Sequence, residues 1–123
     1  MSVRVEITEL ADRIAEFGST PFLMTTSESG RPHATHVVVA VVDGGLRCGV
    51  GRKTAANAAA RPTVSFLWPP TAPGGFSLIV DGDAEVVEAE TPTILVRATA
   101  AVLHRNASND GYAADCVPLD GRH

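Results

Sequence analysis

The strongest constraint on the fold lies in residues 21–50, where β-rich segments alternate with short turn signals. The stretches "SESGRP" and "DGG" each stand between segments rich in β-branched and aromatic residues, which is the pattern of hairpins. This pattern predicts strands near 21–27, 33–42 and 45–50. Strands joined by short turns run antiparallel, so we expect an antiparallel sheet.

The second of these strands is apolar along its whole length. Its segment "HVVVAVV" (36–42) does not alternate apolar with polar residues, so both faces of the strand should be covered. One face can fill the core of a barrel. The other face needs a second layer, which a helix, a partner subunit or a ligand can provide.

Three more strands complete the predicted sheet, at 63–68, 76–88 and 91–105. Gly82 should form a bulge or bend in the long middle one. The alanines in 91–105 permit a helix, but the many β-branched residues there favour a strand. The sequence thus predicts a mainly β protein, a small six-stranded antiparallel barrel.

Two helices should accompany the strands. Apolar residues recur at helical spacing over 7–17 and Gly18 follows as a stop signal, which predicts an amphipathic N-terminal helix of about three turns. A shorter helix is expected after the third strand, because five of the six residues in 55–60 are alanine. Pro62 disfavours helix at the residue before it, so this helix should end near Arg61.

Composition limits the classes of function. The chain has 123 residues, a net charge of −4 and 5% aromatic residues, so neither nucleic acid nor an anionic membrane is an expected partner. Its longest apolar run, 37–42, is far shorter than the about 20 residues of a membrane helix. Cys48 and Cys116 form neither a disulfide framework nor a CxxC motif. We expect a cytoplasmic protein with reduced thiols, one domain over 1–105 and a polar C-terminal tail over 106–123.

Two cations stand at the start of the short helix. Arg52 and Lys53 precede the alanine run, and Thr54 is expected to cap the helix through its hydroxyl. Cations at a helix N-terminus cost about 0.3–1 kcal/mol each. A bound phosphate would reverse that sign, since helix-start amides, Arg52, Lys53 and Thr54 would converge on it. An ordinary solvated basic loop is the other interpretation, and spacing alone does not decide between them.

The order of these elements resembles a known family. The succession "SGRPHATHVVVAVVDGGLRCGVGRKTAANAAARPTVSFLW" (29–68) is similar to the core of the pyridoxamine 5′-phosphate oxidase-like proteins, the FMN-binding split barrels. The resemblance covers about residues 18–88, with a weaker echo in 91–105, and the combined order of elements carries it. It implies a six-stranded antiparallel split β-barrel, usually a homodimer that binds two flavins at the subunit interface. A partner subunit or a flavin would then cover the outer face of the second strand.

The resemblance also implies a set of cofactor-binding residues. The cofactor phosphate would be held by a group at the helix start, Arg52, Lys53, Thr54 and Asn57. The isoalloxazine ring would lie along the second strand, at His36, Val37 and Val38. The third strand would pass the ring and ribityl chain at Cys48, Gly49 and Val50, and Trp68 would reach the partner's cofactor.

The chain also departs from the oxidases. The second strand lacks the additional basic residue usual there and reads "HATHV", and the C-terminal segment that grips pyridoxal phosphate is missing. Vitamin B6 oxidation is therefore not expected. The short form resembles small actinobacterial members of this superfamily, some of which reduce substrates with a deazaflavin. The cofactor is accordingly predicted to be FMN or, as the alternative, a deazaflavin of the F420 type.

Other side chains give weaker signals. His33 and His36 point to opposite faces of a strand and make a poor metal site, so no metal is predicted. Cys48 should be a small buried hydrophobe rather than a nucleophile. The acidic stretch 80–90 should be a solvated strand face, and His104 with Arg105 is either solvated or faces a partner's site.

The predicted function is hydride transfer between a flavin-type coenzyme and a small planar substrate. The cofactor would supply the reactive atom, and the sequence identifies no catalytic acid or base. Two alternatives stay open. One is a carrier that binds a flavin or a tetrapyrrole without turnover, and the other is an empty barrel that serves as a dimeric interaction module.

Overall fold

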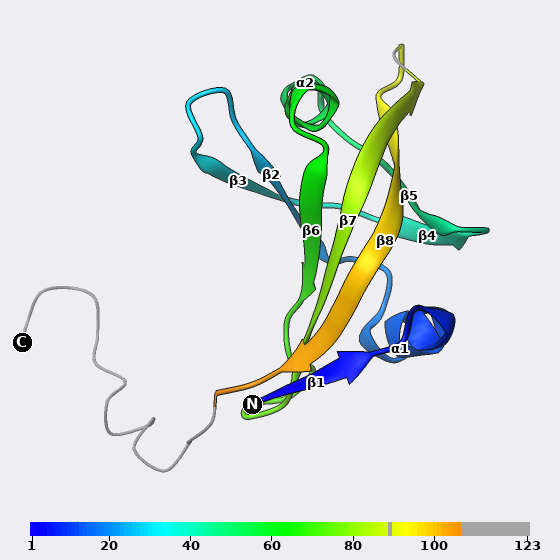
Figure 1. Ribbon diagram of the computed structural model, residues 1–123, viewed down its shortest axis with the longest axis vertical. Helices are drawn as coiled ribbons and strands as arrows, with labels where there is room; N and C mark the ends of the chain where they lie inside the picture. Colours follow the sequence, from blue (N-terminus) through cyan, green and yellow to red (C-terminus); the bar gives the residue numbers. More distant parts are fainter. Residues whose placement is uncertain (89, 107–123) are drawn as a thin grey trace, which may run out of the picture.

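The computed structural model describes residues 1–88 and 90–106, and in these residues the chain forms one antiparallel sheet with two α-helices (Figure 1). The described part holds eight strands: β1 (Ser2–Val5), β2 (Phe22–Thr26), β3 (Pro32–His36), β4 (Val39–Val42), β5 (Gly45–Gly49), β6 (Thr63–Trp68), β7 (Ser77–Glu88) and β8 (Thr93–His104). A 3-10 turn (Ile7–Glu9) leads into α1 (Leu10–Phe17), and α2 (Arg52–Ala60) follows β5. The predicted mainly β, antiparallel class of fold is confirmed.

The sheet coils into a barrel that stays open. Its strand order is β3-β2-β6-β7-β8-β5-β4, with β1 added beside β8. The two ends of this path, β3 and β4, pair with β2 and β5 respectively and not with each other. In Figure 1 the β2–β3 hairpin projects to one side of the sheet, with α2 above the adjacent strand ends. This split between the hairpin and the rest of the barrel positions the pocket described below.

The predicted second strand is divided into two, which corrects the expected count of six strands. β3 pairs with β2, whereas β4 pairs with β5 and brings Val39 opposite Cys48. Between them the Val37 amide donates to the Pro21 carbonyl at 3.1 Å and the Val39 amide to the Ser19 carbonyl at 2.8 Å. The backbone therefore keeps its hydrogen bonds where it passes from pairing with β2 to pairing with β5.

Only one face of this crossing is covered by the chain itself. Val37 and Val39 are buried, whereas Val38 between them is 66% exposed. The alternation follows from the period of two in extended backbone. Within the described residues no helix covers the outer face, so Val38 is exposed there.

The N-terminal region differs from its prediction in two ways. Residues 2–5 add β1, which pairs antiparallel with β8 and which the sequence did not predict. The predicted three-turn helix is an α-helix only from Leu10, because residues 7–9 form the tighter turn. Leu10 and Ile14 are buried, and Gly18 ends the helix with a φ of 98° that favours glycine.

The core is formed by the inward side chains of the strands and of both helices. Its fully buried larger side chains include Trp68, Phe66, Leu23, Leu46 and Leu78. The predicted strand at 91–105 is confirmed as β8, and its register with β7 shifts between Asp81 and Gly82, as the predicted bulge requires. No helix in the described residues is long and apolar enough to span a membrane. The predicted tail, apart from Asn106, lies outside the described residues.

Candidate functional site

The start of α2 determines where its two cations point. Gly51 is the N-cap and Arg52 the first helical residue, with no side-chain cap hydrogen bond, so the expected cap by Thr54 is wrong. Successive helical residues are rotated by about 100° around the axis. Because both cations lie inside the helix, they face different sides of it. Thr54 is buried on the side of α2 that faces the sheet.

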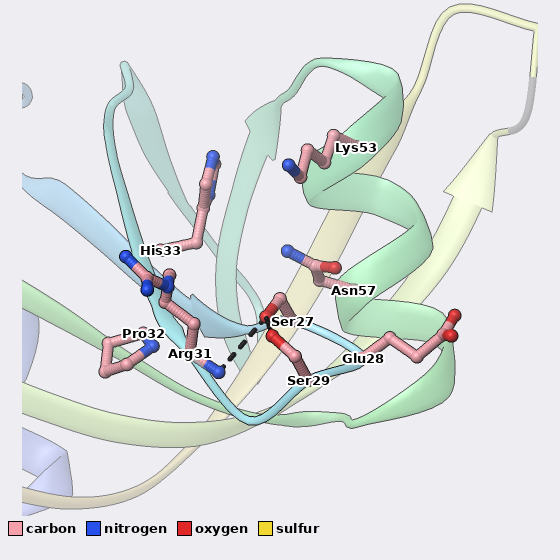
Figure 2. Close-up of a pocket in the computed structure, with 8 residues that line it drawn as sticks. All are labelled: Ser27, Glu28, Ser29, Arg31, Pro32, His33, Lys53 and Asn57. Carbon is pink, nitrogen blue, oxygen red and sulfur yellow. Dashed lines mark hydrogen bonds between the residues drawn. The ribbon is translucent and has the colours of Figure 1, made fainter.

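Lys53 lines a pocket between α2 and the β2–β3 hairpin, which we call the hairpin pocket (Figure 2). Its cavity volume is about 560 Å³, within the range of small-molecule sites. The side chains of Lys53 and Asn57 extend from one face of α2, and His33 stands opposite on the hairpin. The pocket is lined by Ser27, Glu28, Ser29, Arg31, Pro32, His33, Lys53 and Asn57.

A tight turn holds the hairpin wall in place. The Ser27 amide donates to the Arg31 carbonyl at 2.9 Å, and the Gly30 amide donates to the Ser27 carbonyl at 2.8 Å. Gly30 has a φ of 86°, which this turn requires and glycine supplies without strain. The Arg31 amide also donates to the Ser27 hydroxyl at 3.1 Å. Three hydrogen bonds of Ser27 thus hold this turn, and two of them engage the backbone of Arg31.

The helix wall is tied to the same hairpin. Asn57 is 5% exposed, and its Nδ2 donates to Thr25 Oγ1 at 3.3 Å. Arg61, the C-cap of α2, donates through Nε to the Thr26 carbonyl at 2.8 Å. Both contacts join α2 to β2, so the two walls of the hairpin pocket form one unit. The predicted end of the helix near Arg61 is confirmed.

His33 contributes the least satisfied polar atom of the pocket. Its Nδ1 is buried and has no hydrogen-bond partner among the described residues. Neither His33 nor Arg31 was among the predicted site residues. Their spacing of two places both on one face of an extended strand, and this signal was available in the sequence.

Arg52 lies beside a different, more apolar groove. That groove has a volume of about 590 Å³ and runs along the alanine face of α2 towards the β7–β8 connection. It is lined by Arg52, Ala55, Ala56, Ala59, Val86, Glu90 and Pro92. Of the predicted phosphate-binding group, the chain therefore brings Lys53 and Asn57 together in the hairpin pocket and places Arg52 outside it.

The predicted ring-binding strand carries an exposed aromatic and aliphatic patch. The His36 ring stacks on Phe22, with ring centroids 5.0 Å apart, and its Nε2 donates to the Thr20 carbonyl at 2.9 Å. A carbonyl only accepts, so Nε2 carries a proton in this arrangement. We call Phe22, His36 and Val38 the outer patch. Val37 lies behind it in the core.

The remaining predicted site residues lie on or near the core. Cys48 is buried, and burial raises the pKa of its thiol from 9.0 to about 11. Gly49 is exposed, and the Val50 amide donates to the Pro92 carbonyl at 2.9 Å. Trp68 is 1% exposed and donates its indole N–H to the Gly18 carbonyl at 2.7 Å. The structure thus places Cys48 and Trp68 inside the protein.

Metal-ligating side chains do not cluster in the described part of the chain. Within residues 1–88 and 90–106 there is no group of three or more histidines, cysteines, aspartates or glutamates that could hold a metal ion. The hairpin pocket is a site of mixed donors and cations, with Glu28 its one acidic lining residue. Such a lining suits an anionic organic ligand.

Comparison with known proteins gives a consistent picture. No family model matches the chain. It is 34% identical over 137 residues to the uncharacterized proteins Mb0449c of Mycobacterium bovis and MT0457 of Mycobacterium tuberculosis, covering 93% of this chain and 94% of each relative.

Solved structures share the fold at lower identity. A Listeria innocua protein named for pyridoxamine 5′-phosphate oxidase has a TM-score of 0.66 at 16% identity, covering 82% of this chain and 100% of that chain. An F420 reductase has a TM-score of 0.56 at 22% identity and covers 67% and 87%. A heme binding protein from Mycobacterium smegmatis has a TM-score of 0.65 at 18% identity and covers 87% and 57%. The chain therefore belongs to the family of the two mycobacterial relatives, and its fold is the pyridoxamine 5′-phosphate oxidase-like split barrel.

Proposed function

We propose that this protein binds a flavin-type coenzyme, FMN or a deazaflavin, and transfers a hydride between it and a small planar substrate. One observation carries the proposal. Lys53 and Asn57 on one face of α2 meet Arg31 and His33 of the hairpin across a single open pocket. A cation on each wall, with the Asn57 amide and the His33 ring beside them, is a set of groups that binds a phosphate.

The residues present fit the phosphate end of such a coenzyme. A buried histidine nitrogen without a described partner needs a hydrogen-bonding group, and a phosphate offers several acceptor oxygens. Lys53 supplies a cation, and the amide of Asn57 is held in place by Thr25. In this scheme the coenzyme supplies the hydride chemistry, and the chain's residues bind and orient it.

A second copy of the chain is the proposed cover of the outer patch. Val38 is 66% exposed and Phe22 38% exposed, and removing such side chains from water is favourable. The patch includes two of the residues predicted to run along the coenzyme ring, His36 and Val38. We therefore propose a homodimer in which the outer patch contacts the partner and the coenzyme ring together.

The comparisons support this function at the level of the fold. Similar structures include an F420 reductase, which supports a deazaflavin, and a heme binding protein, which supports the alternative of a tetrapyrrole carrier. The hairpin pocket favours the phosphate-bearing coenzymes. A tetrapyrrole would need a flat apolar slot beside its axial ligand, and of the residues that line this pocket all but Pro32 are polar or charged.

Coenzyme titration tests the proposal. The purified protein is titrated separately with FMN, with F420 and with haem, and binding is followed by fluorescence or absorbance. Binding of FMN or F420 is expected, with a Kd that rises about 10- to 100-fold in Lys53→Met, because a hydrogen-bonded cation at a phosphate contributes about 1.5–3 kcal/mol. Arg4→Met is the matched control, since it removes an exposed cation from β1. If the protein binds haem but neither FMN nor F420, it is a tetrapyrrole carrier. If it binds none of the three, the proposal is refuted.

Turnover separates an enzyme from a carrier. Reduced coenzyme is mixed with quinone-type and nitroaromatic acceptors in the presence and absence of the protein, and its oxidation is followed by absorbance. An oxidoreductase accelerates the oxidation of the reduced coenzyme. A carrier binds it equally well but leaves the rate at or below that in free solution.

A further inference from the structure

We propose that the β2–β3 hairpin is a second arm of the anion site, in which His33 Nδ1 and the Arg31 guanidinium bind the anionic group of the ligand. The inference rests on the proposed function and deepens it. The phosphate contacts predicted from the sequence all lie on α2. The structure adds an opposing wall, on which His33 stands opposite Lys53 and Asn57 and Arg31 is a further lining residue (Figure 2).

The first argument is the unpaired nitrogen of His33. Buried polar atoms in proteins are nearly always hydrogen-bonded, and leaving one unpaired costs about 1–3 kcal/mol. His33 Nδ1 is buried without a partner among the described residues, and its side chain lines the hairpin pocket. A ligand group that reaches Nδ1 removes this cost. A ligand can therefore supply the hydrogen bond that the described residues do not give to His33 Nδ1.

The second argument is the state of the two cations that flank the pocket. Neither the Arg31 guanidinium nor the Lys53 ammonium makes a hydrogen bond or ion pair with a side chain of the described residues. Glu28 also lines the pocket but pairs with neither of them. The donors of both cations are thus available to an anion that enters between the walls.

The third argument is the rigidity of the hairpin wall. Three hydrogen bonds of Ser27, two with its backbone and one with its hydroxyl, hold the turn that carries Arg31, and Arg61 holds α2 against the end of β2. A group held in advance binds with less loss of conformational freedom than one on a mobile loop. The hairpin can therefore contribute affinity, rather than merely border the pocket.

Paired substitutions at His33 test the assignment. His33→Asn keeps a polar group near the position of Nδ1, whereas His33→Leu keeps a similar size without one. We expect the Kd of the coenzyme that binds, FMN or F420, to rise about tenfold or more in His33→Leu, and less than about threefold in His33→Asn. Arg31→Met should also raise the Kd about tenfold, and Arg4→Met is the control for a lost surface charge. Thermal unfolding of each variant confirms that the fold is intact.

The outcomes separate this inference from the proposed function. If the wild type binds the coenzyme, Lys53→Met weakens binding, and neither His33→Leu nor Arg31→Met does, the hairpin arm is refuted while the function stands. Equal weakening in His33→Leu and His33→Asn would refute the role of Nδ1.

A second probe tests the anion site in the case where neither FMN nor F420 binds. Inorganic pyrophosphate is titrated into 15N-labelled wild-type protein, and the imidazole nitrogens of His33 are followed by NMR. A saturable shift of Nδ1 that is absent in Lys53→Met supports a two-walled anion site, even if no flavin-type coenzyme binds. No shift at Nδ1, with or without coenzyme binding, overturns the inference.

Discussion

Burial controls the chemistry of Cys48. Its pKa is raised from 9.0 to about 11, because the surrounding core disfavours the charged thiolate. The nucleophile is the thiolate, so a thiol of this kind is inert near neutral pH. The prediction that Cys48 is a small buried hydrophobe agrees with its 3% exposure.

The raised pKa of Cys48 has a consequence for stability. The folded pKa lies above the unfolded one, so the stabilising effect is full below about pH 9 and is lost as pH rises towards 11. Between about pH 8 and pH 10 the free energy of unfolding should fall by about 1 kcal/mol more in the wild type than in Cys48→Ala. Urea titrations at both pH values measure this difference. An identical pH dependence in the two proteins would contradict the assigned burial.

Trp68 carries a structural hydrogen bond. Its indole nitrogen donates to the carbonyl of Gly18, the residue that ends α1 with a φ of 98°. Trp68→Phe should lower the free energy of unfolding by about 1–3 kcal/mol, since it leaves a carbonyl unpaired and a gap in the core. Urea unfolding followed by circular dichroism measures the loss. Coenzyme affinity, compared at a temperature where both proteins are folded, shows whether Trp68 also acts at the cofactor.

At the scale of the elements, the residue at which α2 begins determines the directions of its side chains. The sequence predicted both the short helix and its end at Arg61, because alanine propensity and Pro62 are local signals. It did not predict that Gly51, and not Thr54, would be the N-cap. That choice depends on how the loop leaves β5, which is a tertiary property. Its effect is to turn Arg52 and Lys53 towards different pockets.

The bulge in β7 gives a prediction at the same scale. A Cβ atom built on Gly82 would lie 2.5 Å from the Arg97 carbonyl oxygen and 2.6 Å from Val96 Cγ1, both on the neighbouring strand. Gly82→Ala should therefore destabilise the protein by about 1–3 kcal/mol, as overpacking of a core does.

A glycine in β5 provides the matched control for Gly82. A Cβ atom on Gly49 would meet only the Pro92 carbonyl, at an ordinary 3.9 Å. Gly49→Ala should change the free energy of unfolding by less than about 1 kcal/mol. Thermal unfolding of both variants makes the comparison. Equal losses would show that the bulge does not depend on a missing side chain.

For the whole molecule, the class of fold was accessible from the sequence because turn signals and β-rich segments are local. The crossing at Val37 and Val38 was not, because an unbroken apolar run looks the same whether a strand keeps its partner or exchanges it. β1 was missed for a related reason. Its four residues become a strand only by pairing with β8, which lies about a hundred residues away in the chain.

The sequence indicated only those pocket residues that lie on a single element. Lys53 and Asn57 stand four residues apart on one helix, and that spacing is visible in the sequence. The contribution of Arg31 and His33 depends on α2 packing beside the β2–β3 hairpin, which only the folded chain shows. Residues that meet across two elements are therefore those the sequence reveals least.

The proposed homodimer gives a prediction for the whole molecule. The wild type should have twice the 12.8 kDa mass of one chain in size-exclusion chromatography with light scattering. Val38→Asp places a charge in the proposed interface and should yield the monomer, because an unpaired buried charge is costly. Val87→Asp changes another exposed valine, on β7, and should remain dimeric. A monomeric wild type would contradict the proposal, as would dissociation by both variants.

The pairing of β1 with β8 brings the start of the chain beside the end of the sheet. The Met1 ammonium donates to the Arg105 carbonyl at 2.8 Å, and Ser2 lies opposite His104. A force applied between residues 1 and 105 would load this antiparallel ladder one hydrogen bond at a time, as a zipper opens, instead of shearing all its bonds together. Under tension the protein should accordingly begin to open at this corner, with β1 peeling away before the barrel yields.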